Sequence, residues 1–148
     1  MKNLSVVLLF LALVCHKDIY ANTNDIIWTD TIPTFLTGQF MDDYGIGYTI
    51  NDTIWLQLPN VKYHILQCDT SAQYLLARND ERNPGDPGLF TRIDYMHLND
   101  MKPFEWGFCL TVYDAKTMEE AKLKSKADRT NPKTGCNGYP FSRMKIRD

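Results

Sequence analysis

The stretch YHILQCDTSAQYLLA, residues 63–77, has the composition of two β-strands joined by a short turn. Residues 63–68 and 74–77 are rich in aromatic and aliphatic side chains, which favour strands. Residues 69–71, Asp-Thr-Ser, are turn formers because their short polar side chains bond to nearby backbone. We therefore expect a hairpin at this point in the chain.

Similar segments surround this hairpin on both sides. Strand-like segments begin at 38–40, and six strands are expected at 48–50, 54–58, 63–68, 74–77, 89–98 and 105–113. The segment 105–113 carries Trp106, Phe108, Leu110 and Val112 at every second position, as one face of a strand requires. Short strands at close spacing predict a mainly β fold, an antiparallel meander of about six strands that forms a small barrel or half-barrel.

One helix interrupts the β pattern near the C-terminus. Thr117 and Glu120 have the spacing of a capping box, and good helix formers follow them, so we expect a helix over about 115–128. Residues 129–148 contain two prolines and two glycines and are expected to form an irregular tail. The sequence predicts a single domain over residues 22–148.

The N-terminus has the pattern of a secretory signal peptide over residues 1–21. Lys2 precedes an uncharged run over 4–15, and Ala21 offers a small residue at the cleavage point. Lipidation at Cys15 is a rival interpretation. The run is shorter than the about 20 apolar residues that a membrane span needs, and no later segment is long enough. We expect a secreted, extracellular protein without a membrane span, periplasmic if the source is bacterial.

Three cysteines remain after such processing: Cys68, Cys109 and Cys136. In an exported protein, cysteines are disulfide candidates. We favour a Cys109–Cys136 disulfide that fastens the tail to the sheet and leaves Cys68 as a buried thiol, with Cys68–Cys136 as the competing pair. Asn51 begins a glycosylation sequon, which matters if the source is a eukaryote.

Charge is unevenly distributed along the predicted domain. Residues 22–115 contain 13 acidic and 5 basic side chains, whereas residues 116–148 contain 4 acidic and 9 basic ones. Basic residues are not interleaved with aromatics as in a nucleic-acid-binding face, so we expect no nucleic-acid partner.

The sequence contains no recognisable catalytic or cofactor motif. His64 and His97 do not have metal-binding spacing, and no serine lies in a nucleophile motif. We therefore predict a non-enzymatic protein without a cofactor. The acidic loop 79–86 is a candidate calcium site, because calcium takes oxygen ligands; its oxygen-bearing side chains are Asn79, Asp80, Glu81, Asn83 and Asp86.

Residues 63–79 resemble the central hairpin of lipocalins, with Asp69 and Tyr74 where that motif places an acid and an aromatic residue. Gly38-Gln39-Phe40 is similar to the Gly-x-Trp opening of the same superfamily, with Phe40 in place of Trp. The resemblance covers roughly residues 38–115. It implies a barrel that carries a small ligand.

Two functions are therefore open. The first is a secreted lipocalin-like protein that binds a small apolar ligand, with Arg92 or Tyr95 as a polar anchor; the candidate ligand-binding residues are Trp55, Tyr63, Tyr74, Phe90, Arg92, Tyr95 and Trp106. The alternative is an extracellular structural or interaction module without a cavity, which binds calcium through the loop 79–86. Internal aromatics can either line a cavity or fill a core, and the sequence leaves both open.

Overall fold

The computed structural model describes residues 30–147 of the chain. The predicted signal peptide and the alternative lipidation site at Cys15 lie outside the described residues.

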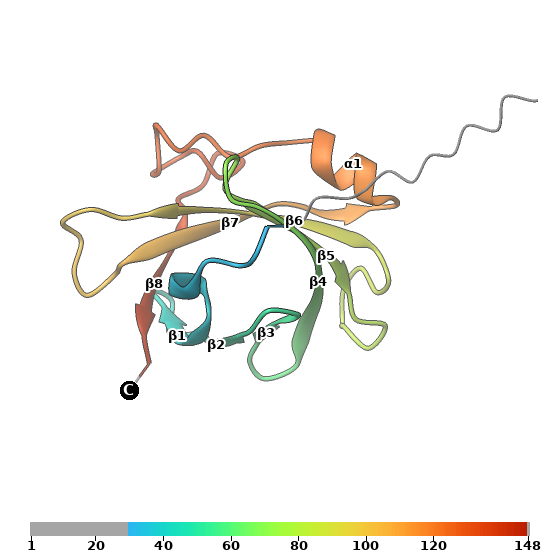
Figure 1. Ribbon diagram of the computed structural model, residues 1–148, viewed down its shortest axis with the longest axis horizontal. Coiled ribbons are helices and arrows are strands. Elements are labelled where there is room, and N and C mark those ends of the chain that lie inside the picture. The colour runs from blue at the N-terminus through green and yellow to red at the C-terminus, as the bar shows by residue number, and fades with distance from the viewer. Residues whose placement is uncertain (1–29, 148) are drawn as a thin grey trace, which may run out of the picture.

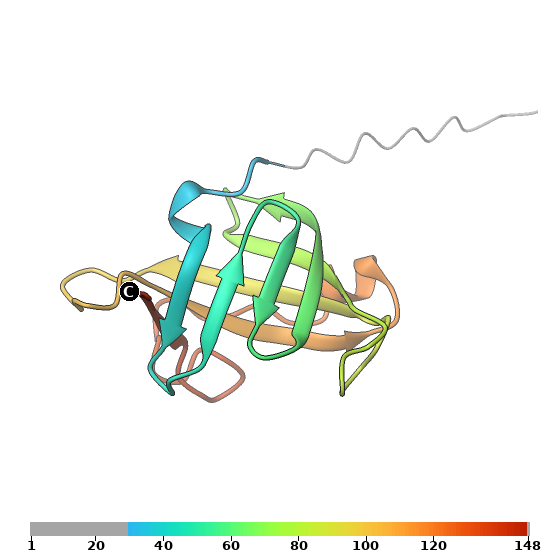
Figure 2. The same cartoon turned by 90° about the horizontal axis from the view of Figure 1, so that it is seen from below.

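Eight antiparallel strands form a closed barrel in which each strand pairs with the next and β8 pairs with β1 (Figures 1 and 2). In chain order the strands are β1 (Gly38–Asp42), β2 (Gly47–Ile50), β3 (Ile54–Gln57), β4 (Val61–Asp69), β5 (Tyr74–Asn79), β6 (Phe90–His97), β7 (Trp106–Ala115) and β8 (Ser142–Ile146). The predicted fold class is confirmed, with eight strands in place of about six.

The two additional strands are β1 and β8. β8 lies inside the predicted irregular tail, where Met144 is fully buried between neighbouring strands. β8 is short and follows prolines and glycines, so its own sequence gives little indication of a strand. Pairing with β1 and β7 stabilises it, whereas its intrinsic strand propensity contributes little.

The hairpin expected at 63–77 is formed by β4 and β5. Its register shifts between Ile65 and Gln67, so one extra residue on β4 faces solvent, and the Leu66 side chain there is 46% exposed. A bulge of this kind bends the strand and increases its twist, which helps a small sheet close into a barrel.

Strands β6 and β7 are covered on both faces, unlike the strands on the other side of the barrel. On their inner face Ile93 and Tyr95 belong to the barrel core, whereas Val112 packs outside beneath the helix α1 (Met118–Leu123). On β6 itself Phe90 packs with this outer cluster, so apolar residues occupy both sides of the segment 89–98.

The helix α1 begins as predicted but ends early. The Thr117 hydroxyl accepts a hydrogen bond from the Glu120 N–H, and the Glu120 carboxylate accepts one from the Lys116 N–H. The helix then stops at Leu123, well before residue 128, and the chain continues as irregular structure. Within residues 30–147, no helix has the length and apolar character needed to cross a membrane.

The predicted disulfide joins Cys109 on β7 to Cys136 in the C-terminal loop, with 5.5 Å between their Cα atoms. Cys68 is the free, buried cysteine of the described chain. At one end of the barrel, the short 3-10 helix η1 (Thr34–Leu36) inserts Leu36 into the core (Figure 1).

Candidate functional site

The barrel interior is filled by aromatic side chains that contact one another. Trp55 and Trp106 are each 1% exposed, and their ring centroids lie 5.9 Å apart with the planes nearly perpendicular. Phe108 packs 5.0 Å from Trp55, and Phe40 packs 5.1 Å from Trp106. Edge-to-face contacts at these distances are typical of a packed protein core.

Within residues 30–147, two polar atoms of this core have no hydrogen-bond partner, the Tyr95 hydroxyl and the Trp106 indole nitrogen. Buried donors normally have a partner, since an unpaired one costs free energy. By contrast, the buried Tyr48 hydroxyl donates to the Asp42 carboxylate at 3.0 Å.

The predicted ligand-binding residues divide between two places. Trp55, Tyr63, Tyr95 and Trp106 lie in the barrel core. The remaining three lie outside the barrel: Tyr74 and Phe90 belong to the cluster beneath α1, and the Arg92 guanidinium lies over the Tyr74 ring and bonds to Asp94. The structure therefore does not bring the seven residues together in one site. The split arises because the outer face of β5–β7 is covered and thus also apolar.

Four of the five oxygen-bearing side chains of the acidic loop 79–86 bond within the protein, namely those of Asn79, Asp80, Glu81 and Asn83. The Asn79 side-chain oxygen accepts from the Thr91 hydroxyl, and the Asn83 amide bonds to both backbone groups of Lys62. The Asp80 carboxylate contacts His64 at 2.8 Å. Glu81 pairs with Arg78. Within residues 30–147, no group of three or more His, Cys, Asp or Glu side chains could hold a metal ion. The loop geometry therefore gives no support to the calcium hypothesis.

The glycosylation candidate Asn51 lies in the exposed turn between β2 and β3. Its side-chain oxygen accepts hydrogen bonds from the backbone N–H groups of Thr53 and Ile54. The turn leaves the residue accessible from solvent, and modification there stays a prediction.

A hollow of about 500 Å³ lies on the outside of the barrel, and we call it the apolar groove. Three segments far apart in the sequence form it: the β1–β2 turn, the β6–β7 loop and the C-terminal loop with the start of β8. Its lining residues are Asp43, Tyr44, Leu98, Met101, Pro132, Lys133, Pro140, Phe141 and Arg143. Most of these side chains are apolar, which distinguishes this groove from the hollow beside β1 and β8 and from the one beside α1.

An ion pair fixes the polar side of the apolar groove. The Arg143 side chain donates to the Asp43 carboxylate at 2.8 Å, and the Arg143 backbone N–H donates to the same carboxylate at 3.1 Å. The guanidinium also lies 4.8 Å from the Phe104 ring centroid. These contacts connect the β1–β2 turn with β8 and with the β6–β7 loop, so the groove walls hold one another in place.

Sequence reasoning did not identify this groove. Tyr44 and Met101 lie in turns, where a single apolar residue has no periodicity to reveal its partners. A faint signal was available, because Tyr44 and Met101 are large apolar residues in segments otherwise made of turn formers.

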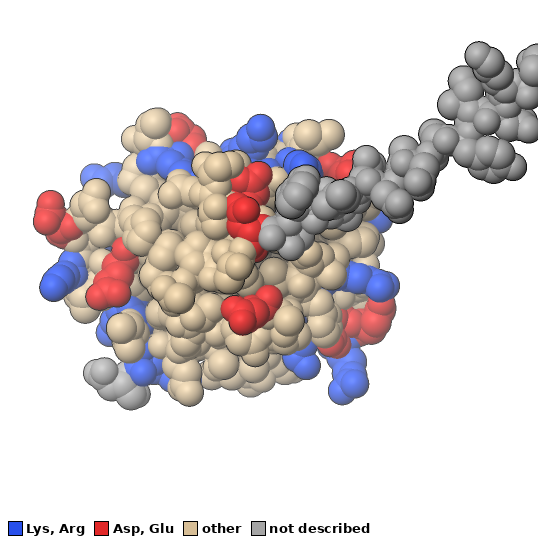
Figure 3. All heavy atoms as spheres, in the orientation of Figure 1, with Lys and Arg blue, Asp and Glu red and all other residues tan. Residues whose placement is uncertain are grey.

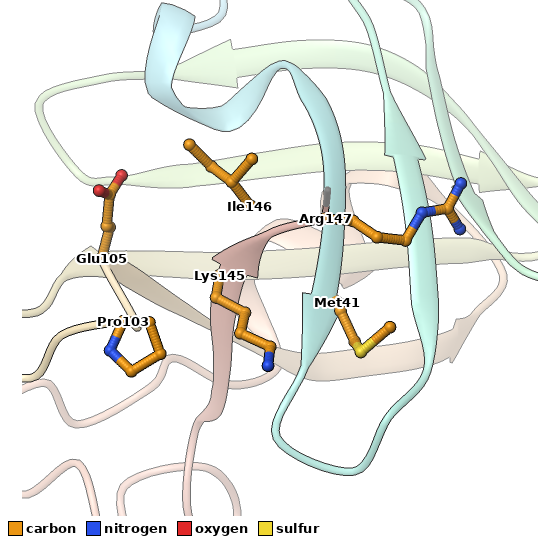
Figure 4. Close-up of a pocket in the computed structure, with 6 residues that line it drawn as sticks. All are labelled: Met41, Pro103, Glu105, Lys145, Ile146 and Arg147. Atoms are coloured by element: carbon orange, nitrogen blue, oxygen red, sulfur yellow. The ribbon is translucent and has the colours of Figure 1, made fainter.

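A second hollow, of about 460 Å³, lies beside β1 and β8 (Figure 4). Its lining is mixed, and the figure shows the Glu105 and Lys145 side chains pointing away from each other, with Arg147 reaching across β1. The Arg147 guanidinium donates to the Gln39 side chain at 2.8 Å. These polar groups do not converge on one point, so this hollow is a weaker candidate than the apolar groove.

Comparison of the chain with protein-family models, with curated proteins and with solved structures finds no match.

Proposed function

We propose that this protein is a non-catalytic binding protein whose apolar groove takes a small apolar molecule bearing a negatively charged group. The observation that carries the proposal is the groove itself, a hollow of about 500 Å³ with mainly apolar walls and few polar groups. This size and lining are those of a typical small-molecule site. The filled barrel core favours an external site over an internal one.

Exposed apolar side chains at the groove support ligand binding. Tyr44 is 70% exposed and Met101 is 38% exposed. A ligand in the groove would remove part of this apolar surface from water, which contributes roughly 25 cal/mol for each Å² buried.

The charges around the groove favour an anionic ligand. Asp43 neutralises Arg143, and Lys133 forms no salt bridge within residues 30–147. Lys133 therefore provides a net positive charge beside apolar walls. A carboxylate or sulfonate on an aromatic or aliphatic body would complement both features.

The barrel and the disulfide fit an exported lipocalin-like carrier. Disulfides persist in oxidising compartments, so the Cys109–Cys136 bond supports the secretion that the N-terminal sequence predicts.

The first test uses 1-anilinonaphthalene-8-sulfonate, an apolar dye with a sulfonate whose fluorescence rises in apolar surroundings. We expect saturable binding that the double variant Tyr44→Ser/Met101→Ser weakens about tenfold, or about 1.4 kcal/mol. The matched control is Tyr113→Ser/Tyr139→Ser, because Tyr113 and Tyr139 are 51% and 73% exposed and line neither the apolar groove nor the basic one. Equal losses in the two double variants would reject the site.

Lys133→Gln separates the role of charge from that of apolar contact. We expect it to weaken binding of the sulfonate dye and to leave binding of the uncharged analogue N-phenyl-1-naphthylamine unchanged. A change of the same size for both dyes would contradict the role assigned to Lys133.

A second candidate, an internal ligand, rests on the unpartnered Tyr95 hydroxyl and Trp106 nitrogen. A small ligand with hydrogen-bond acceptors could satisfy both if the core rearranged to admit it. Native mass spectrometry of the secreted protein tests this. A bound mass that is lost on denaturation and persists in Tyr44→Ser/Met101→Ser supports the internal site, whereas a mass that the variant loses belongs to the apolar groove.

A further inference from the structure

A third hollow, of about 410 Å³, lies between the β4–β5 turn and the segment that runs from α1 to Arg129. We call it the basic groove, because four of the side chains that line it are Arg92, Lys122, Lys126 and Arg129. Figure 3 shows basic side chains along the edge of the molecule that carries α1 and the C-terminal segment, with a few acidic ones among them. Asp69 is the acidic residue in the lining.

At the floor of the basic groove, two guanidinium groups donate hydrogen bonds to the same carboxylate. Asp94 is fully buried and accepts from Arg92 at 2.8 and 2.9 Å, and from Arg129 at 2.9 Å. The Thr111 hydroxyl donates to the same carboxylate. One positive charge of the floor is therefore not neutralised by Asp94, and Arg92 is only 2% exposed. Charges away from bulk water attract an opposite charge more strongly than exposed ones.

Tyr74 adds a buried hydroxyl donor to the same place. It is 3% exposed, and the Arg92 guanidinium carbon lies 3.9 Å from the centroid of its ring. Its buried hydroxyl lies near the Asp69 carboxylate, but within residues 30–147 it makes no hydrogen bond of good geometry. Burial, and secondarily the nearby Asp69 carboxylate, raises the pKa of Tyr74. The hydroxyl therefore stays protonated and can donate a hydrogen bond.

The hydrogen-bond donors and the net positive charge of the basic groove indicate which class of ligand it binds. Four basic side chains face two carboxylates, Asp69 and Asp94, which leaves two positive charges at the groove. Guanidinium groups match the geometry of tetrahedral oxyanions, and lysine adds a mobile point charge. We propose that the basic groove binds a phosphate or sulfate group, held by Arg129, Lys122, Lys126 and the Tyr74 hydroxyl.

The test titrates the mature chain with inorganic phosphate and, separately, inorganic sulfate at constant ionic strength, followed by amide chemical shifts in NMR. We expect saturable shifts confined to residues 70–74 and 122–129. Lys122→Gln/Lys126→Gln should weaken binding about tenfold, as expected for lost charge-assisted contacts. The control Lys102→Gln/Lys116→Gln removes the same charge from two exposed positions outside the groove and should change affinity less than twofold.

Tyr74→Phe gives an independent measurement, since it keeps the ring under Arg92 and removes only the hydroxyl. We expect weaker phosphate binding and an unchanged or higher melting temperature. A lower melting temperature with unchanged phosphate affinity would show a purely structural hydroxyl and overturn its role. Shifts that spread over the molecule and never saturate, or equal losses in the two lysine double variants, would overturn the site. The variant Tyr44→Ser/Met101→Ser alters only the apolar groove and should still bind phosphate. This measurement shows whether the two grooves bind their ligands independently.

Discussion

At the scale of single residues, Cys68 shows how the barrel core controls chemistry. It is 2% exposed, and burial raises the pKa of its thiol from an ordinary 9.0 to about 11. Because the thiolate is the reactive form, this thiol stays inert at neutral pH while the barrel is folded. The free, buried state of Cys68 confirms the prediction that Cys109 and Cys136 form the disulfide and leave Cys68 as a buried thiol.

The raised pKa of Cys68 predicts a loss of stability in alkali. Below about pH 9 both the folded and the unfolded thiol are protonated, so Cys68 contributes no pH dependence. Between pH 9 and about 11 the unfolded state loses the proton first, and the free energy of unfolding falls. Urea denaturation at pH 8, 9, 10 and 11 should therefore show a steeper decline for the wild type than for Cys68→Ala. Parallel curves would contradict the prediction, because the buried tyrosines titrate in both proteins.

At the scale of elements, Asp94 on β6 connects the sheet with the C-terminal segment. Besides bonding to Asp94, Arg129 donates to the backbone carbonyls of Ala72, Gln73 and Tyr95. These bonds place the chain after α1 against the β4–β5 turn, which accounts for the early end of the helix. A six-residue helix is marginal by itself, so tertiary contacts determine where it stops.

Replacing Asp94 by Asn should be strongly destabilising, by about 3–5 kcal/mol, because it leaves two guanidiniums without a carboxylate, one of them buried. Asp114→Asn is the matched control, since Asp114 and Lys124 form an ion pair in which both side chains are about half exposed. Such surface pairs contribute about 0–1 kcal/mol. Urea denaturation measures both variants, and similar losses would refute the role assigned to Asp94.

The sequence predicts those elements that have a local signal. The hairpin 63–77 and the Thr117 cap follow from composition and spacing, and the structure confirms them. The face predicted for β7 is correct only in part: Trp106 and Phe108 lie in the barrel core, whereas Val112 lies outside it, because the pairing of β6 with β7 shifts register beside Arg92. β8 has no such signal, because Ser142–Ile146 becomes a strand only through pairing with β1 and β7. Both grooves were missed for the same reason. Asp43 and Arg143, for example, are 100 positions apart and meet only after the barrel has closed.

At the scale of the whole molecule, barrel closure depends on the last strand and on the loop that precedes it. The segment between α1 and β8 has little regular structure and covers the outer face of β7. Cys136 fastens this segment to Cys109 on β7, and Ala127 and Phe141 pack beside the disulfide. β8 then follows directly after Phe141 and inserts Met144 into the core.

Removing the disulfide should therefore weaken the whole fold and not only the tail. Cys109→Ser/Cys136→Ser opens a loop spanned by 27 positions, whose closure contributes about 3.5 kcal/mol by restricting the unfolded chain. Small domains have only about 5–15 kcal/mol of stability, so this loss is large. Urea denaturation should show one cooperative transition for the double variant and for the reduced wild type, at a lower urea concentration than for the oxidised wild type. The control Cys68→Ala should respond to reductant as the wild type does. If the double variant unfolds in two steps, with loss of the tail first, then the C-terminal segment is an independent appendage and closure of the barrel does not depend on it.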